Sequence, residues 1–484
     1  MSQIVLSTGQ VYPQSVTQHE GSTYFLCKLH ANSEHQLGVI GDRDGFTGAP
    51  TPDGAILLCP LSATNAAALR ARLPWMRPVP LGRQASFGFG DRLGSATPGH
   101  IQAMRTLCAG QPMAPIYGQQ SVRENTRTER TPQQVVDFAM WGVLQEGWRD
   151  PWGADADHVK EIAVLAPFVA AGYTFYTIDP SDHVDNEAQT DNLATLRRKA
   201  SALPWDELGV TYDEMFNAYC EAPFELEGLT LSFDEETLLR ALVKYGRAVA
   251  HTLAIANELN AQMGGEAYDL EMSVDETDTP TSIHEHYFIA NELLQRNVPV
   301  VSLAPRFVGK FQKGVDYMGD LDEFEAELVQ HTTILHHFDA YKLSVHTGSD
   351  KFSIYPAINE HAHGYVHVKT AGTSYLEALR VVAQVDAPLF RQMLALAREH
   401  FNDDRKSYFI DARLDFVPVD EDLQDSDLPN LFEQFDARQV MHVTFGSILD
   451  EFGDELHAFI ASHESEYRAG LEKHFGRHLA PFCT

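Results

Sequence analysis

From about residue 83 onward, short apolar runs alternate with longer segments of amphipathic, helix-like sequence. Several runs are continuously apolar, as expected for parallel strands that are buried on both faces. The predicted strands span residues 85–90, 115–118, 152–157, 174–178, 268–274, 300–303, 341–346 and 365–369. Eight strands, each followed by helical sequence, predict a (β/α)8 barrel of the TIM type, and a doubly wound α/β sheet is the competing fold.

The segments between these strands carry helical periodicity. Ser232 and Glu235 have the spacing of a capping box, which predicts that a helix begins there. A second apolar stripe repeats at helical spacing from Phe324 to Phe338. Both segments are long enough to cover the outside of a barrel.

The length of 484 residues exceeds what a plain barrel needs. Residues 1–80 lack a strong period and are rich in turns, so we expect a partly β N-terminal addition packed on the barrel. Residues 81–484 then form the barrel. Within it, 185–230 is too long for a plain connection and is interpreted as a helical insertion over one barrel end. Residues 386–484 are mostly helical in pattern.

Composition narrows the class of partner. Lys and Arg total 36 against 68 Asp and Glu, a formal charge of -32. This balance disfavours nucleic acid and anionic membrane surfaces, which both require a positive face. An anionic substrate would need its own local Arg and Lys residues. The five cysteines are scattered without CxxC spacing, which predicts a reducing compartment and neither a disulfide scaffold nor a cysteine zinc site.

No targeting segment is evident. Residues 1–9 have no basic region followed by an apolar stretch, so no signal peptide is predicted. The most apolar long run, 162–178, contains Pro167 and Gly172 and changes from helical to strand-like composition, so it is not read as a membrane span. The sequence therefore predicts a soluble, cytoplasmic protein that does not act at a membrane.

Polar residues gather where the predicted strands end, which is where barrel enzymes place their chemistry. Asp157 and His158 end the third strand, and His346 ends the seventh at the same level. Two imidazoles with oxygen ligands suit a divalent ion, and an adjacent carboxylate suits a base. Any single histidine among 22 is more often structural, so the pair carries the inference.

Other strand ends carry further charge. Arg92 follows the first strand, Glu271 lies in the fifth and Arg306 follows the sixth. Residues 370–374 open the helix after the eighth strand, where backbone N–H groups can hold an anion, with help from Lys351 and Lys369. An ordinary hydroxyl helix cap is the alternative reading there.

Several motifs resemble metal, dinucleotide or serine-hydrolase sites but lack the required spacing. His284-Glu285-His286 and His336-His337 lack metal-ligand spacing and are expected to be solvated. Residues 88–94 resemble a dinucleotide loop, but the third glycine comes one residue late and no matching βαβ unit follows. No GxSxG elbow is present, so a serine hydrolase is not favoured.

Three contiguous stretches carry a family resemblance: residues 301–314, 344–351 and 367–374. Here the chain resembles the tagaturonate/fructuronate epimerase family of hexuronate catabolism, whose close relatives act as tagatose 4-epimerases. The resemblance covers most of the chain from about residue 80. Its Asp-His pair also looks like that of class II ketose aldolases.

The resemblance implies a barrel with one divalent metal bound by His158, Gln312 and His346, of which zinc, manganese, cobalt and nickel all remain open. It implies Asp157 and Glu271 as base and acid in a retro-aldol epimerisation of a keto sugar or keto uronate. The alternative for Glu271 is a carboxylate paired inside the barrel. The residues expected to bind substrate are Arg92, Arg306, Lys351, Lys369, Thr370, Gly372 and Thr373.

Other functions stay open. A class II-type metal-dependent ketose aldolase would use the same groups and release both fragments, and a non-catalytic barrel subunit would need no stoichiometric ion. Isomerisation of an aldose is a weaker alternative. The sequence does not distinguish a hexuronate from a neutral ketohexose, and it leaves the oligomeric state open.

Overall fold

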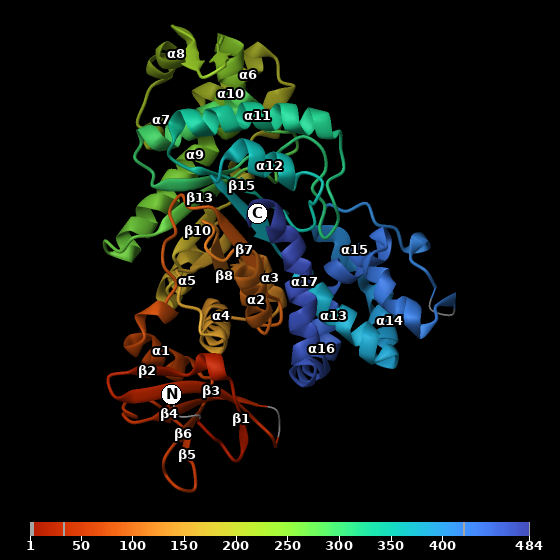
Figure 1. Cartoon of the computed structure of the whole chain (residues 1–484). Coiled ribbons are helices and arrows are strands. Elements are labelled where there is room, and N and C mark those ends of the chain that lie inside the picture. The colour runs from red at the N-terminus through yellow and green to blue at the C-terminus, as the bar shows by residue number, and fades with distance from the viewer. Residues whose placement is uncertain (1–3, 32–33, 420–421, 484) are drawn as a thin grey trace.

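The structure is a computed structural model that describes residues 4–31, 34–419 and 422–483. Its centre is a closed barrel of eight parallel strands (Figure 1), which confirms the predicted (β/α)8 fold. The barrel strands are β7 (Ser86–Gly90), β8 (Ala114–Ser121), β9 (Gly153–Val159), β10 (Phe175–Ile178), β13 (Asp269–Ser273), β14 (Val300–Ala304), β15 (Lys342–Val345) and β16 (Val366–Thr370). Each predicted strand overlaps one of them.

A ring of helices surrounds the barrel. Its members are α2 (Thr97–Leu107), α4 (Pro132–Glu146), α5 (Leu165–Ala171), α9 (Glu235–Met263), α10 (Ile283–Gln295), α11 (Leu321–Phe338), α12 (Tyr355–Ala362) and α13 (Thr373–Val385), with short α3 (Val122–Arg127) before α4. The cap of α9 differs from the prediction. Asp234, not Ser232, accepts the N–H of Thr237, because Phe233 is buried in the core and the chain turns into the helix after it.

Strand register places polar side chains inside the barrel. Glu271 on β13 lies level with Thr177 on β10 and with Ser302 on β14, while its neighbours Leu270 and Met272 belong to the hydrophobic core. Alternate residues of a strand point to opposite faces, so the polar set faces inward and the apolar set faces the helices. This interior is unusually charged for a barrel, where branched apolar residues are the rule.

The first 80 residues, expected to be partly β, contain an antiparallel sheet at the bottom of Figure 1. Its strands are β1 (Gly9–Val11), β2 (Thr17–His19), β3 (Ser22–Leu29), β4 (His35–Ile40), β5 (Ala49–Pro50) and β6 (Leu57–Pro60). Helix α1 (Ala63–Arg72) connects the sheet to the barrel, and the partly buried ion pair of Arg70 with Asp137 joins α1 to α4.

The long segment between β10 and α9 packs against α9 and α10 of the outer ring (Figure 1). It contains α6 (Leu193–Ser201), α7 (Trp205–Leu208), α8 (Tyr212–Cys220) and the hairpin β11 (Phe224–Leu226) with β12 (Leu229–Leu231). Tyr219 donates a hydrogen bond of 2.6 Å to Glu292 of α10, which fixes α8 to the ring.

The C-terminal segment adds α14 (Ala387–Asp404), α15 (Phe435–Val443), α16 (Phe445–Ser462) and α17 (Glu464–Cys483). Helix α17 packs along α2, and a disulfide joins Cys108 to Cys483 there. The sequence predicts no disulfide scaffold, and this single disulfide was not predicted, because its members are 375 residues apart and only the packing of α17 on α2 brings them together. In the described part of the chain, no helix is long and apolar enough to cross a membrane.

Candidate active site

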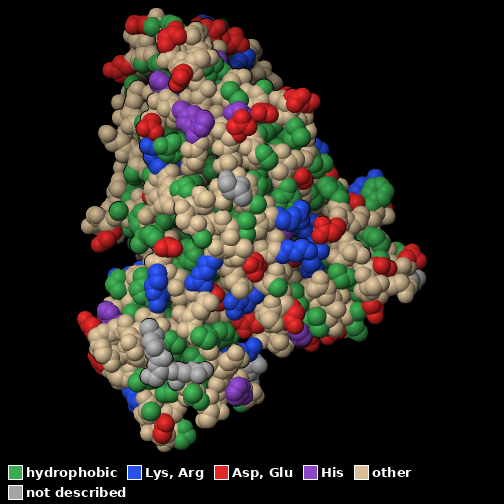
Figure 2. All heavy atoms as spheres, in the orientation of Figure 1, with side chains coloured by type: hydrophobic (Ala, Val, Ile, Leu, Met, Phe, Trp, Pro, Cys, Tyr) green, Lys and Arg blue, Asp and Glu red, His purple; other side chains and the backbone are tan. Residues whose placement is uncertain are grey.

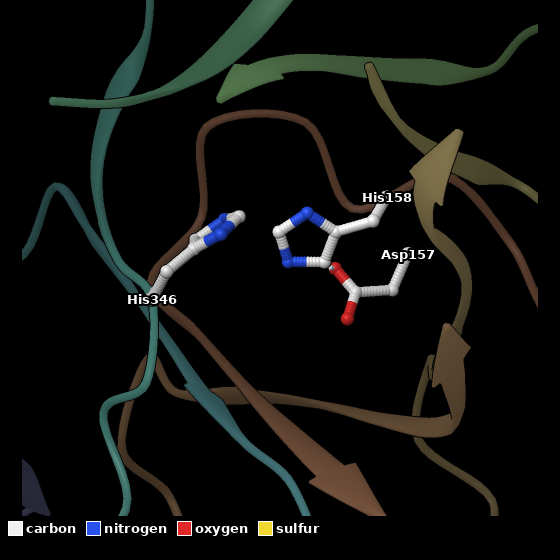
Figure 3. Close-up of side chains that lie close together, drawn as sticks. All are labelled: Asp157, His158 and His346. Carbon is white, nitrogen blue, oxygen red and sulfur yellow. Dashed lines mark ion pairs between the residues drawn. The ribbon is translucent and has the colours of Figure 1, made fainter. Parts of the chain in front are cut away.

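Two histidines meet at the C-terminal end of the barrel. Asp157 and His158 come from β9, and His346 directly follows β15. The two imidazole centroids are 5.1 Å apart, and one ligand atom from each of Asp157, His158 and His346 lies within 4.8 Å of the others (Figure 3). We call these three residues the mouth cluster. The sequence predicts that His158 and His346 lie at the same level of the barrel mouth, and their joint role as metal ligands stays a prediction.

A carboxylate lies behind each ring. Asp179 Oδ2 is 3.2 Å from His158 Nδ1, and Asp275 Oδ1 is 3.2 Å from His346 Nδ1. A carboxylate on Nδ1 fixes the tautomer and leaves Nε2 as the donor atom, an arrangement common behind metal-bound histidines. His158 Nε2 lies on the side of Asp157, 3.8 Å from its Oδ1.

The backbone at this point is in an unusual conformation. His158 has φ of 55° and Thr347, directly after His346, has φ of 49°. Such left-handed conformations cost residues with a Cβ roughly 1–3 kcal/mol and persist where the surroundings impose them. Both departures flank the mouth cluster, so the fold holds these side chains in place at some cost in stability.

Lys369 of β16 balances the charge below the cluster. Its Nζ lies 2.8 Å from Asp155, 2.9 Å from Asp157 and 3.0 Å from Glu271, and it also donates to Thr177. Burial opposes the charged ammonium, but Asp155 and its neighbours raise the pKa of Lys369 above its ordinary value. Lys369 is therefore a buried cation that holds three carboxylates together.

Glu271 is both buried and close to the cluster. Its Oε1 is 2.6 Å from His346 Nε2, and its Oε2 accepts the hydroxyl of Ser302. Although burial favours the neutral acid, Lys369 and His346 lower the pKa of Glu271 well below its usual range. The paired carboxylate considered from the sequence is thus present, and it contacts one of the two imidazoles.

Negative charge is in excess around the imidazoles. Burial opposes their protonation, yet Asp157 and Asp179 raise the pKa of His158 to about 9. Asp275, with Glu271, likewise raises the pKa of His346 to about 10 against burial. Surroundings that favour the cationic imidazole this strongly also favour a bound cation.

A cavity of about 620 Å³ opens beside the cluster and is lined by His346, Asp275 and Arg306. The basic side chains in its wall are Arg123, Arg306, Lys310, Lys313 and Lys406. Figure 2 shows Lys and Arg side chains gathered where the loop before α11 meets the C-terminal helices. The same wall holds Asp275, Glu276 and Asp278, so cations outnumber carboxylates there. In a chain of net charge -32, this is a local excess of positive charge of the kind that an anionic substrate requires.

Of the residues predicted to bind substrate, Arg306 lines this cavity and two others are engaged elsewhere. Arg92 is buried, pairs with Glu124 at 2.8 Å and stacks on Phe445. Lys351 is also buried, and its Nζ donates to three backbone carbonyls, including that of Gln312. Burial lowers the pKa of Lys351 to about 7.

The loop after β16 is tightly packed. Thr370 donates to the carbonyl of Gly88 at 2.7 Å, and Gly372 precedes α13 with φ of 80°, where a Cβ would meet Arg92. Thr373 is buried, and its hydroxyl has no partner among the described residues. The role of this loop as an anion cradle stays a prediction.

Gln312 is fully buried. Its Oε1 accepts the backbone N–H of Asp411 at 2.9 Å and the Nε2 of Gln439 at 3.1 Å, both from the C-terminal part of the chain. Its own Nε2 has no partner among the described residues. As placed, the amide oxygen is engaged by protein donors, and the metal-ligand role of Gln312 stays a prediction.

Sequence reasoning missed three residues of the site: Asp155, Arg123 and Lys313. Asp155 shares a strand face with Asp157, a signal present in the alternation Asp155-Ala156-Asp157. Arg123 comes from α3 and Lys313 from the loop after β14, and no local pattern sets either apart from surface cations. Only the fold brings them to one cavity.

The prediction that the histidines of residues 284–286 are solvated is wrong for His286. His286 was expected to be solvated, but it is fully buried, with its Nδ1 2.8 Å from His331 Nδ1 and its Nε2 bonded to the Tyr341 hydroxyl. The apolar face of α10 turns it toward α11 and β15, where it forms a structural network. His336 and His337 are exposed, as predicted.

Comparison with known proteins gives consistent matches over nearly the whole chain. Residues 12–482 match the family described as tagaturonate epimerase. The chain is 40% identical over 477 residues to a tagaturonate/fructuronate epimerase of Thermotoga maritima, which covers 97% of this chain and 96% of that protein. The native crystal structure of fructuronate-tagaturonate epimerase from Cohnella laeviribosi is 36% identical, with a TM-score of 0.92 over 98% of this chain and 97% of that one. A crystal structure of the same enzyme complexed with two glycerols has a TM-score of 0.91 and covers 98% and 96% of the respective chains.

Proposed function

Because the chain belongs to the tagaturonate epimerase family, we propose that it is an epimerase that interconverts D-tagaturonate and D-fructuronate with the help of one divalent ion. The observation that carries the proposal is the mouth cluster, with a carboxylate behind each imidazole and a cavity rich in cations beside it. A keto uronate supplies both groups that such a site binds: vicinal oxygens for an ion, and a carboxylate for the cations.

Interconversion of the two uronates requires cleavage of a carbon–carbon bond. The two uronates differ at the hydroxyl-bearing carbon β to the ketone, whose hydrogen the carbonyl does not acidify, so enolisation does not invert it. When a base removes the proton of that hydroxyl, the bond between the α and β carbons opens. An enediolate and an aldehyde form, and re-addition to the other face of the aldehyde gives the epimer.

The residues present fit a divalent ion. Each imidazole has a carboxylate on Nδ1, and Asp157 adds an oxygen within the same 4.8 Å group. His158 Nε2 faces Asp157, whereas His346 Nε2 lies 2.6 Å from Glu271, which an ion would displace from that nitrogen. We propose His158, His346 and Gln312 as ligands of zinc, manganese, cobalt or nickel, all of which accept imidazole and amide oxygen. When bound, the ion supplies Lewis-acid stabilisation of the oxyanion that develops at the substrate.

Two carboxylates are proposed to move the protons. Asp157, whose pKa Lys369 holds low against the effect of burial, is ionised and suited to accept the hydroxyl proton. Glu271 is proposed to exchange a proton on the other side, and its Oε1 lies 2.6 Å from His346 Nε2. Lys369 keeps both in position through its ion pairs, and Arg306 contributes to the cavity that receives the substrate.

The test is conversion of tagaturonate by the purified protein, followed by NMR of the products before and after chelation. We expect fructuronate to form, activity to be lost with the ion and to return on adding back one equivalent. Release of three-carbon products in place of the epimer would assign a ketose aldolase. Full activity without any stoichiometric divalent ion would overturn the metal-dependent mechanism, and absence of both activity and ion would favour a non-catalytic subunit.

A further inference from the structure

We propose that Arg123 and Lys313 form a carboxylate clamp, which binds the terminal carboxylate of the keto uronate and retains the aldehyde fragment while it turns over. The proposal rests on the proposed epimerase function and deepens it, because it names the residues that select a uronate over a neutral ketose. It also gives a reason why the site re-forms the bond after opening it.

The first support is that both cations lack a carboxylate partner. Within the described residues, neither Arg123 nor Lys313 forms an ion pair, although both line the cavity. Other lysines in the same wall are neutralised: Lys310 pairs with Asp411 at 2.8 Å and Lys406 pairs with Asp403 at 2.6 Å. Two partly buried cations at one cavity repel each other, and an anion between them would relieve that repulsion.

The second support is the way each cation is held. Arg123 Nη1 donates to the carbonyl of Ser407 at 3.4 Å, and the guanidinium lies 5.2 Å from the ring of Tyr408. Its Nε is buried with no partner among the described residues. Buried donors of this kind are rare in folded proteins, and an absent ligand accounts for one. A guanidinium with unused donors is the group best suited to a carboxylate.

The third support places the clamp next to the mouth cluster. Lys313 Nζ donates to the Thr347 hydroxyl at 3.1 Å, and Thr347 directly follows His346. The same cavity wall contains Lys313, His346 and Asp275. A six-carbon substrate whose ketone end lies at the mouth cluster can therefore place its carboxylate between Arg123 and Lys313.

The chemistry gives the clamp a purpose. Numbering the carbons from the hydroxymethyl group beside the ketone, the bond between C3 and C4 breaks when the O4 proton is removed. Its electron pair goes to the C1–C3 enediolate, and C4 becomes an aldehyde that stays attached to C5 and the C6 carboxylate. Rotation about the C4–C5 bond presents the other face of C4. C3 then attacks that face, the new O4 alkoxide takes back a proton, and the epimer forms with no atoms gained or lost.

The carboxylate lies on the fragment that must rotate. Held at C6, the aldehyde keeps its freedom about C4–C5 but does not diffuse away, so re-addition is effectively intramolecular. Without that hold, the aldehyde and the protonated enediolate would leave as a hydroxy-oxo acid and dihydroxyacetone. The clamp would thus separate an epimerase from an aldolase that uses the same mouth cluster.

The experiment compares Arg123→Gln and Lys313→Met with Lys199→Met, a control because Lys199 of α6 does not line the cavity and is paired with Asp185 at 2.8 Å. We expect each clamp variant to lose about 10²-fold in kcat/KM for tagaturonate, since a charged partner of the carboxylate is removed. The inhibition constant of tagatose, which has no carboxylate, should change less than about 3-fold, as should every parameter of Lys199→Met. Equal weakening of tagaturonate and tagatose would overturn the clamp.

Product partition gives a second readout that a purely structural role would not move. We expect dihydroxyacetone, measured by NMR during turnover of tagaturonate, to rise several-fold relative to epimer in the clamp variants. Lys313→Arg should restore part of the epimer yield because it restores the positive charge. An unchanged ratio in both clamp variants would contradict retention of the fragment. Failure of the wild-type protein to convert tagaturonate would instead contradict the proposed function, so the two failures are distinguishable.

Discussion

Two groups of histidine and aspartate in the described structure have the same composition and different surroundings. The mouth cluster contains Asp157, His158 and His346, and a second group, here the C-terminal cluster, contains Asp350, His474 and His478. In each group the potential ligand atoms lie within 4.8 Å of one another. The connection after β15 even contributes His346 to one and Asp350 to the other. Composition and proximity alone therefore do not tell them apart.

The partners of the ring nitrogens differ. In the C-terminal cluster, His478 donates from Nδ1 to the carbonyl of His474 and accepts the backbone N–H of Asp350 at Nε2, each at 2.9 Å, so the backbone engages both of its nitrogens. In the mouth cluster every ring nitrogen faces a carboxylate: Asp179 and Asp157 for His158, and Asp275 and Glu271 for His346.

The charges differ as well. Arg438 pairs with Asp350 at 2.9 Å, and burial lowers the pKa of His474 and of His478, so the C-terminal cluster holds neutral imidazoles. In the mouth cluster, carboxylates raise the pKa of both imidazoles. One group is a balanced structural network, and the other accumulates negative charge that a cation can neutralise.

The largest difference is expected from removing one imidazole of each group. His346→Ala should lose the stoichiometric divalent ion and about 10⁴-fold in kcat, because the Lewis acid contributes several kcal/mol to the transition state. His478→Gln should keep the ion and activity within about 3-fold. Metal content by mass spectrometry and kinetics on tagaturonate decide the matter. Equal ion content in both variants would remove the distinction between the two clusters.

A smaller loss is expected at the carboxylates. Glu271→Gln should lower kcat about 10³-fold while retaining the ion, as expected when a group that transfers a proton is neutralised. Glu377→Gln is its counterpart, since Glu377 lies 3.5 Å from His474 in the C-terminal cluster, and its kinetics should match the wild type. Loss of the ion in Glu271→Gln would show that Glu271 serves the metal site and not proton transfer.

The features that could be predicted from the sequence are those set by local patterns or by the topology of the barrel. The barrel was predictable because several of its strands are largely apolar runs, and β14 with Val300, Val301 and Leu303 is an example. The mouth cluster was predictable because barrel topology aligns strand ends, which relates His158 to His346 without any local motif. Glu271 stood out as a charged residue of the fifth strand, whereas its role in proton transfer and the candidate ligand Gln312 entered through family resemblance alone.

The features that the sequence did not predict depend on contacts between segments far apart in the chain. Lys369 was expected to grip the substrate, but the inward-facing Asp155 makes it the centre of a buried ion-pair network. The disulfide between Cys108 and Cys483 forms only when distant segments pack. The same is true of the cavity that Arg123 and Lys313 both line. The sequence shows which residues carry an imidazole or an ammonium group. The hydrogen-bond and ion-pair partners of those groups come from segments far along the chain.

An intermediate effect is expected behind the mouth cluster. Asp179→Asn should weaken divalent ion binding roughly 10- to 100-fold, because the carboxylate fixes the tautomer of His158 that leaves Nε2 free. Asp182→Asn is the control: it changes an exposed carboxylate nearby that faces Lys160, and it should leave the ion affinity unchanged. Competition titration with a chromophoric chelator gives the two affinities. Equal affinities would show that Asp179 has no part in orienting the ligand.

The smallest effect separates the clusters by pH. An imidazole with a lowered pKa binds fewer protons in the folded than in the unfolded chain, so its contribution to stability is lost as the pH falls below about 6.5. Burial lowers the pKa of His474 well below that value, with His478 and Arg438 acting in the same direction and Asp350 opposing them. His474→Gln should therefore reduce the loss in free energy of unfolding between pH 7 and pH 5 by up to about 2 kcal/mol. Urea unfolding of both proteins at the two pH values measures this difference, and an identical loss in wild type and variant would mean that His474 is already protonated in the folded chain.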